Sequence, residues 1–211
     1  MENKTPEILT KIAGYFSAKL AEHGATPGGV GWNGEASQVV RFDQLIKIID
    51  LPEGFSVNDL GCGYGLLYQH LNSRYKDFTY NGYDISEAMI RAAKDRFAHD
   101  PKIHFSVAAR PLETADYGIA SGIFNVRLER SDAEWSDYLK ATLDELDRTS
   151  RRGFAFNCLT SYSDREKMQD YLYYADPCPL FDLCKRRYSR QVALLHDYGL
   201  YDFTILVRKH P

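Results

Sequence analysis

Two spacings of apolar residues alternate along most of the chain, beginning near residue 55. Short apolar runs predict buried strands, whereas apolar residues that recur every three or four positions predict helices with one buried face. The runs that predict strands cover residues 55–60, 78–83, 103–107, 118–124, 153–157, 191–195 and 201–208. Helical spacing falls between them, over residues 66–74, 86–97, 131–146 and 176–184.

Capping residues support three of these helix starts. Ser86 and Asp176 each precede a helical pattern, and Pro177 then occupies the first helical position. Ser131 and Glu134 have the spacing of a capping box. The boundaries of these helices are therefore predicted by local chemistry as well as by periodicity.

Strands that alternate with helices predict a mostly parallel sheet with helices on both faces. The last two predicted strands are joined by too few residues for a crossover, so they must form an antiparallel hairpin. We therefore expect an α/β fold, a three-layer sandwich whose mostly parallel, doubly wound sheet ends in an antiparallel hairpin.

The first 50 residues contain no predicted strand. One helix is expected to begin at Thr5 and Pro6, and another covers residues 35–50, with a glycine-rich stretch that contains Trp32 between them. A chain of 211 residues has the size of one large domain. The expected organisation is a single domain over 1–211, with a helical cap over 1–50, a core over 51–211 and a lid over 159–178.

Charge and cysteine usage narrow the class of protein. The net charge is -3, so the chain lacks the excess of Lys and Arg that is typical of nucleic-acid binding. The four cysteines include no CxxC pair and no zinc-ligand spacing with histidine. Lys11 and Lys19 interrupt the first apolar positions, unlike a signal peptide, and no apolar run is long enough to span a bilayer. We expect a cytoplasmic protein that holds no metal and binds no membrane.

A glycine-rich turn follows the first predicted strand, where residues 57–65 read VNDLGCGYG. Closely spaced glycines let the backbone approach a ligand, and the following helix presents unpaired N–H groups. A dinucleotide-binding fingerprint requires its third glycine where this chain has Leu66. Asp84 ends the next predicted strand, where a carboxylate can accept hydrogen bonds from ribose hydroxyls. In this order, the two features indicate a site for a nucleoside-containing cofactor.

On these motifs, the chain from Phe55 to its C-terminus resembles the class I, Rossmann-like S-adenosylmethionine-dependent methyltransferases. The resemblance implies S-adenosylmethionine as the cofactor, with residues 59–65 around its methionine part, Asp84 on its ribose and Ile85 against its adenine. Residues 120–125 match the strand end beneath the sulfonium. Family members often have an Asp after the third strand, whereas this chain has VAAR, so backbone groups or another side chain must contact the adenine. The expected cofactor-binding residues are Asp59, Gly61, Cys62, Gly63, Asp84, Ile85, Ala109, Arg110, Ser121 and Arg41.

Ligands of open α/β sheets bind outside the carboxyl ends of the strands, and this rule selects candidates for the methyl acceptor's site. His196 is the candidate general base, because imidazole titrates near neutrality; the alternative is a histidine that bonds backbone in the hairpin. Asn125 can orient an acceptor or satisfy a turn. Arg41 can pair with the cofactor's carboxylate or remain a solvated helix-face arginine. Aromatic side chains suit an organic substrate or simply pack on the sheet, and the substrate-binding candidates are Trp32, Phe124, Tyr162 and Tyr198.

The expected function is the transfer of a methyl group from S-adenosylmethionine to an O or N atom of a small molecule. The alternatives are an NAD(P)-dependent oxidoreductase with a variant glycine loop and a non-catalytic S-adenosylmethionine-binding protein. Leu66 and the terminal hairpin count against the oxidoreductase, and the non-catalytic protein would lack room for an acceptor beside Ser121. The basic residues 185–187 end a predicted helix, where cations favourably meet the helix dipole, so nucleic acid is not the expected partner. The sequence leaves the acceptor and the oligomeric state open.

Overall fold

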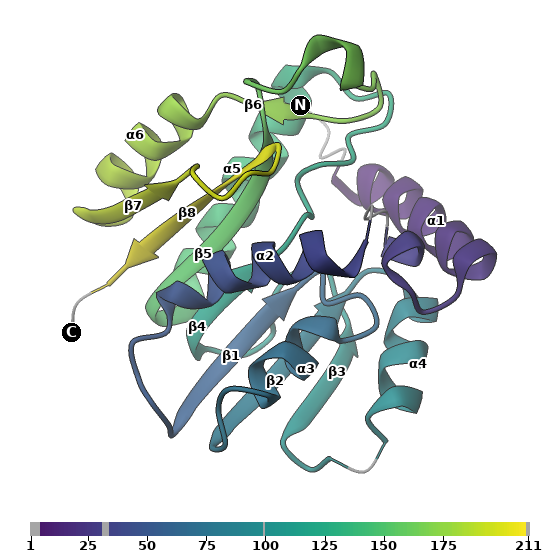
Figure 1. Cartoon of the computed structure of the whole chain (residues 1–211), viewed down its shortest axis with the longest axis vertical. Coiled ribbons are helices and arrows are strands. Elements are labelled where there is room, and N and C mark those ends of the chain that lie inside the picture. The colour runs from purple at the N-terminus through teal and green to yellow at the C-terminus, as the bar shows by residue number, and fades with distance from the viewer. Residues whose placement is uncertain (1–4, 31–33, 99, 210–211) are drawn as a thin grey trace.

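One mixed sheet forms the centre of the computed structural model, which describes residues 5–30, 34–98 and 100–209 (Figure 1). Its strands are β1 (Phe55–Leu60), β2 (Phe78–Asp84), β3 (Ile103–Val107), β4 (Ala115–Ala120), β5 (Ser150–Thr160), β6 (Tyr174–Ala175), β7 (Gln191–Leu195) and β8 (Asp202–Arg208). The α-helices are α1 (Thr5–His23), α2 (Glu35–Leu45), α3 (Leu66–Asn72), α4 (Glu87–Arg96), α5 (Asp132–Arg148) and α6 (Pro177–Arg187). Short 3-10 turns are η1 (Pro27–Val30), η2 (Ile46–Ile48) and η3 (Arg165–Lys167).

The strands are arranged in the order β3-β2-β1-β4-β5-β8-β7, and β6 pairs with β5. Strands β1 to β5 are mutually parallel, while β8 is antiparallel to both of its neighbours. The chain therefore builds outward from β1 in one direction and then returns to place β4 on the other side. Such a reversal opens a crevice at the carboxyl ends of β1 and β4, where ligands of this fold class bind.

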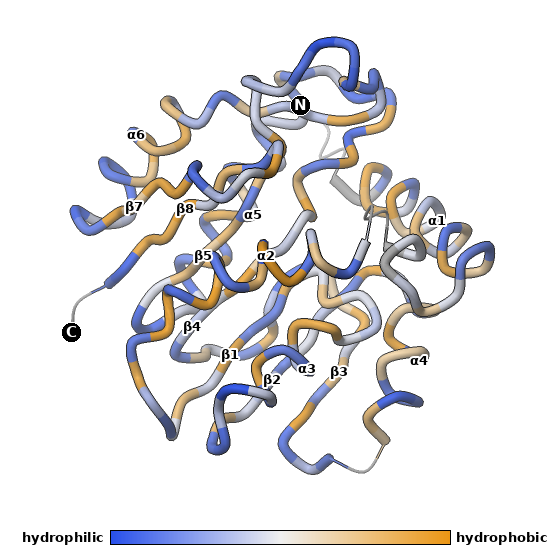
Figure 2. Tube along the Cα trace, in the orientation of Figure 1, coloured by the Kyte–Doolittle hydropathy of each residue, from blue (hydrophilic) through white to orange (hydrophobic). Residues whose placement is uncertain are grey.

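Apolar side chains divide the molecule into three layers. On one face of the sheet, Phe42 of α2, Leu71 of α3 and Ile90 of α4 belong to one buried cluster. On the other face, Leu143 of α5 and Leu180 of α6 belong to a second. Figure 2 shows the apolar segments along the strands and the hydrophilic segments in many of the connecting loops. The expected three-layer α/β fold with its terminal antiparallel hairpin is confirmed.

Several boundaries differ from the sequence-based expectation. Strand β4 covers Ala115–Ala120 and not residues 118–124, because its polar start is paired: Asp116 accepts hydrogen bonds from the Ser56 backbone N–H and hydroxyl. The helix expected over residues 35–50 ends at Leu45 and continues as η2. Phe42 and Leu45 of α2 pack within the main buried cluster, and the division into a cap over 1–50 and a core over 51–211 stays a prediction.

Helix α1 lies across the carboxyl edge of the sheet. Its Ile8 and Ile12 are buried and belong to a small cluster with Trp135 of α5. The segment expected to act as a lid, residues 159–178, is attached to the loop after β4, since Tyr171 accepts two backbone hydrogen bonds from that loop and the Tyr173 N–H donates to the Asn125 carbonyl at 2.8 Å. Within the described ranges, no helix is long and apolar enough to cross a membrane.

Candidate active site

The glycine loop between β1 and α3 requires glycine for steric reasons. Gly61 has φ +78°, and a Cβ on it would lie 2.1 Å from Cγ2 of Ile123. Gly65 has φ +86°, and a Cβ on it would lie 2.7 Å from the Phe97 ring. Both conformations disfavour residues with a side chain. The loop therefore follows a path that brings its backbone to the crevice between β1 and β4.

Strand β2 fixes the other side of this loop. The N–H groups of Gly61 and Cys62 donate to the Tyr83 carbonyl at 2.7 and 3.1 Å. The Gly63 N–H donates to Oδ2 of Asp84 at 2.9 Å, and the Ser86 N–H donates to Oδ1 of Asp84 at 2.8 Å. Burial raises the pKa of Asp84, and the hydrogen bonds from the Gly63 and Ser86 N–H groups offset part of this rise. The carboxylate is thus held in one orientation at the start of the crevice.

A second carboxyl group lies beneath the loop. Asp59 is 2 % exposed and accepts a hydrogen bond from the Tyr80 hydroxyl. Burial raises the pKa of Asp59 from 3.8 to about 7, although the Tyr80 hydrogen bond lowers it. Burial also raises the pKa of the Cys62 thiol well above its usual range, so Cys62 is a packing residue here and not a thiolate nucleophile.

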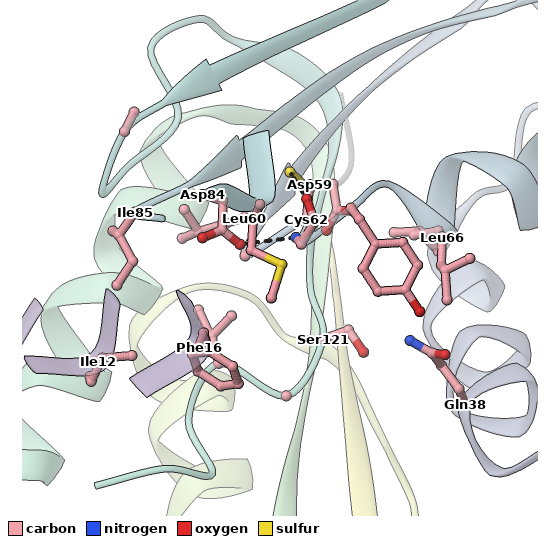
Figure 3. Close-up of a pocket in the computed structure, with 18 of the residues that line it drawn as sticks. Ile12, Phe16, Gln38, Asp59, Leu60, Cys62, Leu66, Asp84, Ile85 and Ser121 are labelled. Atoms are coloured by element: carbon pink, nitrogen blue, oxygen red, sulfur yellow. Dashed lines mark hydrogen bonds between the residues drawn. The ribbon is translucent and has the colours of Figure 1, made fainter. Parts of the chain in front are cut away.

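A cavity that is partly open to solvent occupies the crevice (Figure 3). Ile12 and Phe16 of α1 approach one end near Ile85, and Gln38 of α2 and Leu66 of α3 lie at the other (Figure 3). Its lining residues are Ile12, Phe16, Gln38, Phe42, Asp59, Leu60, Gly61, Cys62, Gly63, Tyr64, Leu66, Leu67, Asp84, Ile85, Met89, Ala108, Ser121, Gly122, Ile123 and Tyr138.

The polar groups of this lining suit a neutral or cationic ligand. Asp59 and Asp84 contribute two carboxyl groups, while no Lys, Arg or His lines the cavity among the residues described. Apolar and aromatic side chains form most of the remaining wall. The arrangement can accept hydrogen bonds from vicinal hydroxyls at Asp84 and cover a flat ring between Ile85 and Phe16.

Seven of the ten residues expected to bind the cofactor line this cavity: Asp59, Gly61, Cys62, Gly63, Asp84, Ile85 and Ser121. Ala109 and Arg110 do not, because the chain turns outward after Ala108 and leaves both exposed. Arg41 does not line it either. Its guanidinium donates to Asp202 at 2.5 Å and to the Ser37 carbonyl at 2.9 Å. Because Arg41 is buried, the solvated alternative is wrong, while its pairing with the cofactor's carboxylate stays a prediction.

Phe124 and Asn125, in the loop after β4, serve the fold. Phe124 is fully buried against Tyr138 and Phe156, and its carbonyl accepts the Trp135 indole N–H at 2.8 Å. The expectation that Phe124 contacts substrate therefore conflicts with its position. Asn125 accepts the Leu159 N–H at 3.0 Å through Oδ1, which favours the turn-satisfying interpretation over acceptor orientation.

The remaining acceptor candidates lie outside the cavity lining. His196 and Tyr162 are exposed, with their rings 5.8 Å apart, and the His196 ring also lies 6.0 Å from Phe203. Tyr198 is half-buried and its hydroxyl pairs with the Thr204 hydroxyl at 3.1 Å. The structure thus places these three side chains at the β7–β8 end of the same sheet edge. Trp32 lies outside the described residues.

Several lining residues were missed by sequence reasoning. Ile12 and Phe16 read only as the apolar face of a helix, and Tyr138 reads only as a neighbour of Trp135 on α5. Gln38 carried no signal, since a single glutamine on a helix is ordinary. Met89 follows the cap residue Ser86 by three positions, which places it over the end of β2 and could have identified it.

Two features of the described residues bear on metal and nucleic-acid ligands. These residues contain no group of three or more His, Cys, Asp or Glu side chains arranged to hold a metal ion. The basic cluster at the end of α6 is paired, since Arg186 bonds Asp182 and Arg187 bonds Asp144, each at 2.7 Å, and Lys185 donates to the Arg190 carbonyl. The free charge that a phosphate backbone would require is therefore largely neutralised there.

Comparison with known proteins agrees with this geometry. Residues 57–153 match the family described as "Methyltransferase domain". The chain is 60% identical over 164 residues to a protein of Mycobacterium tuberculosis (strain ATCC 25618 / H37Rv) named "Putative methyltransferase Rv1506c", a match that covers 78% of this chain and 99% of that protein. The chain therefore belongs to the class I, S-adenosylmethionine-dependent methyltransferases.

Solved structures share the fold at low sequence identity. DhpI in its complex with SAH matches with a TM-score of 0.67 and 16% identity, over 97% of this chain and 98% of that one. Magnesium protoporphyrin IX methyltransferase (ChlM) from Synechocystis PCC 6803, with bound SAH, matches with a TM-score of 0.65 and 16% identity, over 95% and 99%. Human N-acetylserotonin methyltransferase, in complex with SAM, matches with a TM-score of 0.61 and 16% identity, over 94% and 67%.

Proposed function

We propose that this enzyme transfers the methyl group of S-adenosylmethionine to an oxygen or nitrogen atom of a small organic molecule. The observation that carries the proposal is the Asp84 carboxylate, which two backbone N–H groups orient beside a glycine loop. In this position it can accept hydrogen bonds from both ribose hydroxyls. Ile85 and Phe16 supply the apolar surfaces that an adenine ring requires.

The residues present fit the charge of the proposed cofactor. S-adenosylmethionine, when bound, supplies a cationic sulfonium whose methyl group is open to in-line displacement. The Asp84 carboxylate gives the cavity a negative character, to which Asp59 adds charge as the pH rises above its pKa of about 7. This charge suits a cation and disfavours the pyrophosphate of NAD(P). The chain's own contribution to rate is the alignment of two ligands, because proximity and orientation supply most of the help that such a displacement needs.

The proposed acceptor site lies beside Ser121, where β4 ends and the cavity opens. Two structural neighbours are named for the small organic molecules magnesium protoporphyrin IX and N-acetylserotonin, in keeping with this proposal. The net charge of -3 and the paired cations on α6 also favour a small acceptor over nucleic acid. We further propose that His196, Tyr162 and Tyr198 contact the acceptor from the β7–β8 end of the sheet edge.

A binding comparison followed by a transfer assay tests the proposal. S-adenosylhomocysteine should raise the melting temperature of the chain, and NAD at the same concentration should not. Tritiated S-adenosylmethionine is then incubated with the chain and a fractionated metabolite extract, with tRNA and DNA as controls. Labelled methyl groups should appear in small-molecule fractions only; transfer to nucleic acid alone, or stabilisation by NAD alone, would refute the proposal.

A further inference from the structure

Three polar atoms of the cavity lining have no hydrogen-bond partner among the described residues. They are Oε1 of Gln38, the hydroxyl of Tyr64 and the hydroxyl of Ser121. The Gln38 and Tyr64 residues are 5 % and 2 % exposed. Buried polar groups in folded proteins are nearly always hydrogen-bonded, because they lose hydration without compensation otherwise. Three such groups on one cavity wall therefore indicate that a ligand supplies their partners.

Gln38 and Ser121 lie at the end of the cavity away from Ile85 (Figure 3). Figure 3 shows the side chains of Gln38 and Ser121 pointing into a common space, with Asp84 and Ile85 on the far side of the glycine loop. Tyr64 belongs to the loop itself. A ligand whose ribose is bound at Asp84, and whose chain continues along the loop, would reach this space with its other end.

None of the described residues that line the cavity is Lys, Arg or His, although the guanidinium of Arg96, outside the lining, lies 5.7 Å from the centroid of the Tyr64 ring. Arg41 is one helical turn from Gln38, but its guanidinium is turned to Asp202 at 2.5 Å. Burial raises the pKa of Tyr64 to about 12, so its hydroxyl keeps its proton and can donate. Oε1 of Gln38 is an acceptor, and the Ser121 hydroxyl can do either. An ammonium group donates hydrogen bonds and can bond Oε1 of Gln38. A carboxylate accepts hydrogen bonds and can bond the hydroxyls of Tyr64 and Ser121. The wall is therefore complementary to an amino-acid group, which carries both.

We propose that Gln38, Tyr64 and Ser121 recognise the amino-acid end of the cofactor, and that α2 is therefore a cofactor-binding element. This inference rests on the proposed function, because it requires a cofactor with an amino-acid group. Recognition is by uncharged side chains. Gln38 accepts from the ammonium, Tyr64 donates to the carboxylate, and Ser121 bonds whichever group lies nearer.

Two ligands that differ only at this end test the assignment. S-adenosylhomocysteine carries the amino-acid group, whereas 5′-methylthioadenosine keeps the adenosine and the thioether without it. Gln38→Met removes the amide at nearly constant volume, and Tyr64→Phe removes only the hydroxyl. Gln44→Met on the same helix and Tyr75→Phe are the matched controls, because neither residue lines the cavity. Isothermal titration calorimetry measures the affinity for both ligands, and displacement of tritiated S-adenosylhomocysteine measures affinities that are too weak for calorimetry.

Gln38→Met and Tyr64→Phe should each weaken S-adenosylhomocysteine binding by about three- to tenfold, the scale of one neutral hydrogen bond. Binding of 5′-methylthioadenosine should change by less than about twofold, and the melting temperature of the ligand-free chain should not fall, since the deleted atoms have no partner in it. Equal losses for both ligands, or unchanged affinity for both, would overturn the assignment. A wild-type chain that binds neither ligand overturns the proposed function itself.

Discussion

Replacement of Asp84 by Asn is the most direct test of the ribose assignment. The carboxylate accepts the Gly63 N–H at 2.9 Å and the Ser86 N–H at 2.8 Å, one on each oxygen. Asparagine keeps one of these acceptors, and its NH2 group would face the other N–H donor. The variant therefore loses a charge-assisted backbone bond and also the negative charge that a ribose diol would meet.

The expected magnitude follows from these bonds. Hydrogen bonds to charged groups contribute about 1.5–3 kcal/mol, so S-adenosylhomocysteine affinity should fall about ten- to a hundredfold. The free energy of unfolding should change less, by under about 1.5 kcal/mol, because burial of the ionised carboxyl already raises its pKa and so disfavours the charge.

Isothermal titration calorimetry measures the affinity, and Asp95→Asn on the exposed side of α4 is the matched control. Because 5′-methylthioadenosine has the same ribose, Asp84→Asn should weaken both ligands equally, unlike the Gln38 and Tyr64 variants. Affinity within about twofold of the wild type would refute the ribose assignment.

Three further predictions concern buried charge and the acceptor side. Because burial raises the pKa of Asp59 to about 7, the folded chain keeps this proton to higher pH than the unfolded chain, and the free energy of unfolding should fall as pH rises from about 4 to 7. Urea titrations should show that Asp59→Asn flattens the dependence of the free energy of unfolding on pH. An unchanged dependence would contradict the assignment. Arg41→Met leaves the Asp202 carboxylate buried without its cation and should lower the free energy of unfolding by about 3–5 kcal/mol. The double variant Arg41→Met/Asp202→Leu should recover most of this lost stability, and a double variant as unstable as the single one argues against the ion pair as the cause. His196→Ala should lower turnover at least about tenfold while S-adenosylhomocysteine affinity holds, and full turnover would remove His196 as the general base.

The elements that the sequence predicted well are those with a local cause. Strands β1, β3 and β7 have the predicted bounds, because each has at least three apolar residues within five or six positions. Ser131 and Glu134 form the expected capping box, and Asp176 caps α6 through the Cys178 N–H. Strand β4 was placed too late, because Asp116 near its start is polar and is bonded to Ser56, 60 positions away in the chain.

In the candidate site, too, the residues with a local signal in the sequence were predicted better than the others. The cofactor residues on the glycine loop and at the end of β2 were predicted from their order along the chain, and the cavity contains them. The acceptor residues were selected by the rule of strand ends alone, which places a residue at an edge without fixing the direction of its side chain. Phe124 shows the consequence, because it follows β4 as expected and yet points into the core.

Helix α2 shows the limit most clearly. The sequence by itself determined that this helix lies before β1, that glycines follow β1 and that an acid ends β2, because each depends on neighbours within a few residues. Only the tertiary structure decided which residue of α2 reaches the cavity. Asp202, 161 positions along the chain, pairs with Arg41 and removes it from the cavity wall, while Gln38 one turn earlier is left facing the ligand space. Contacts of that separation arise from the folding of the whole sheet and leave no periodic signal in the sequence.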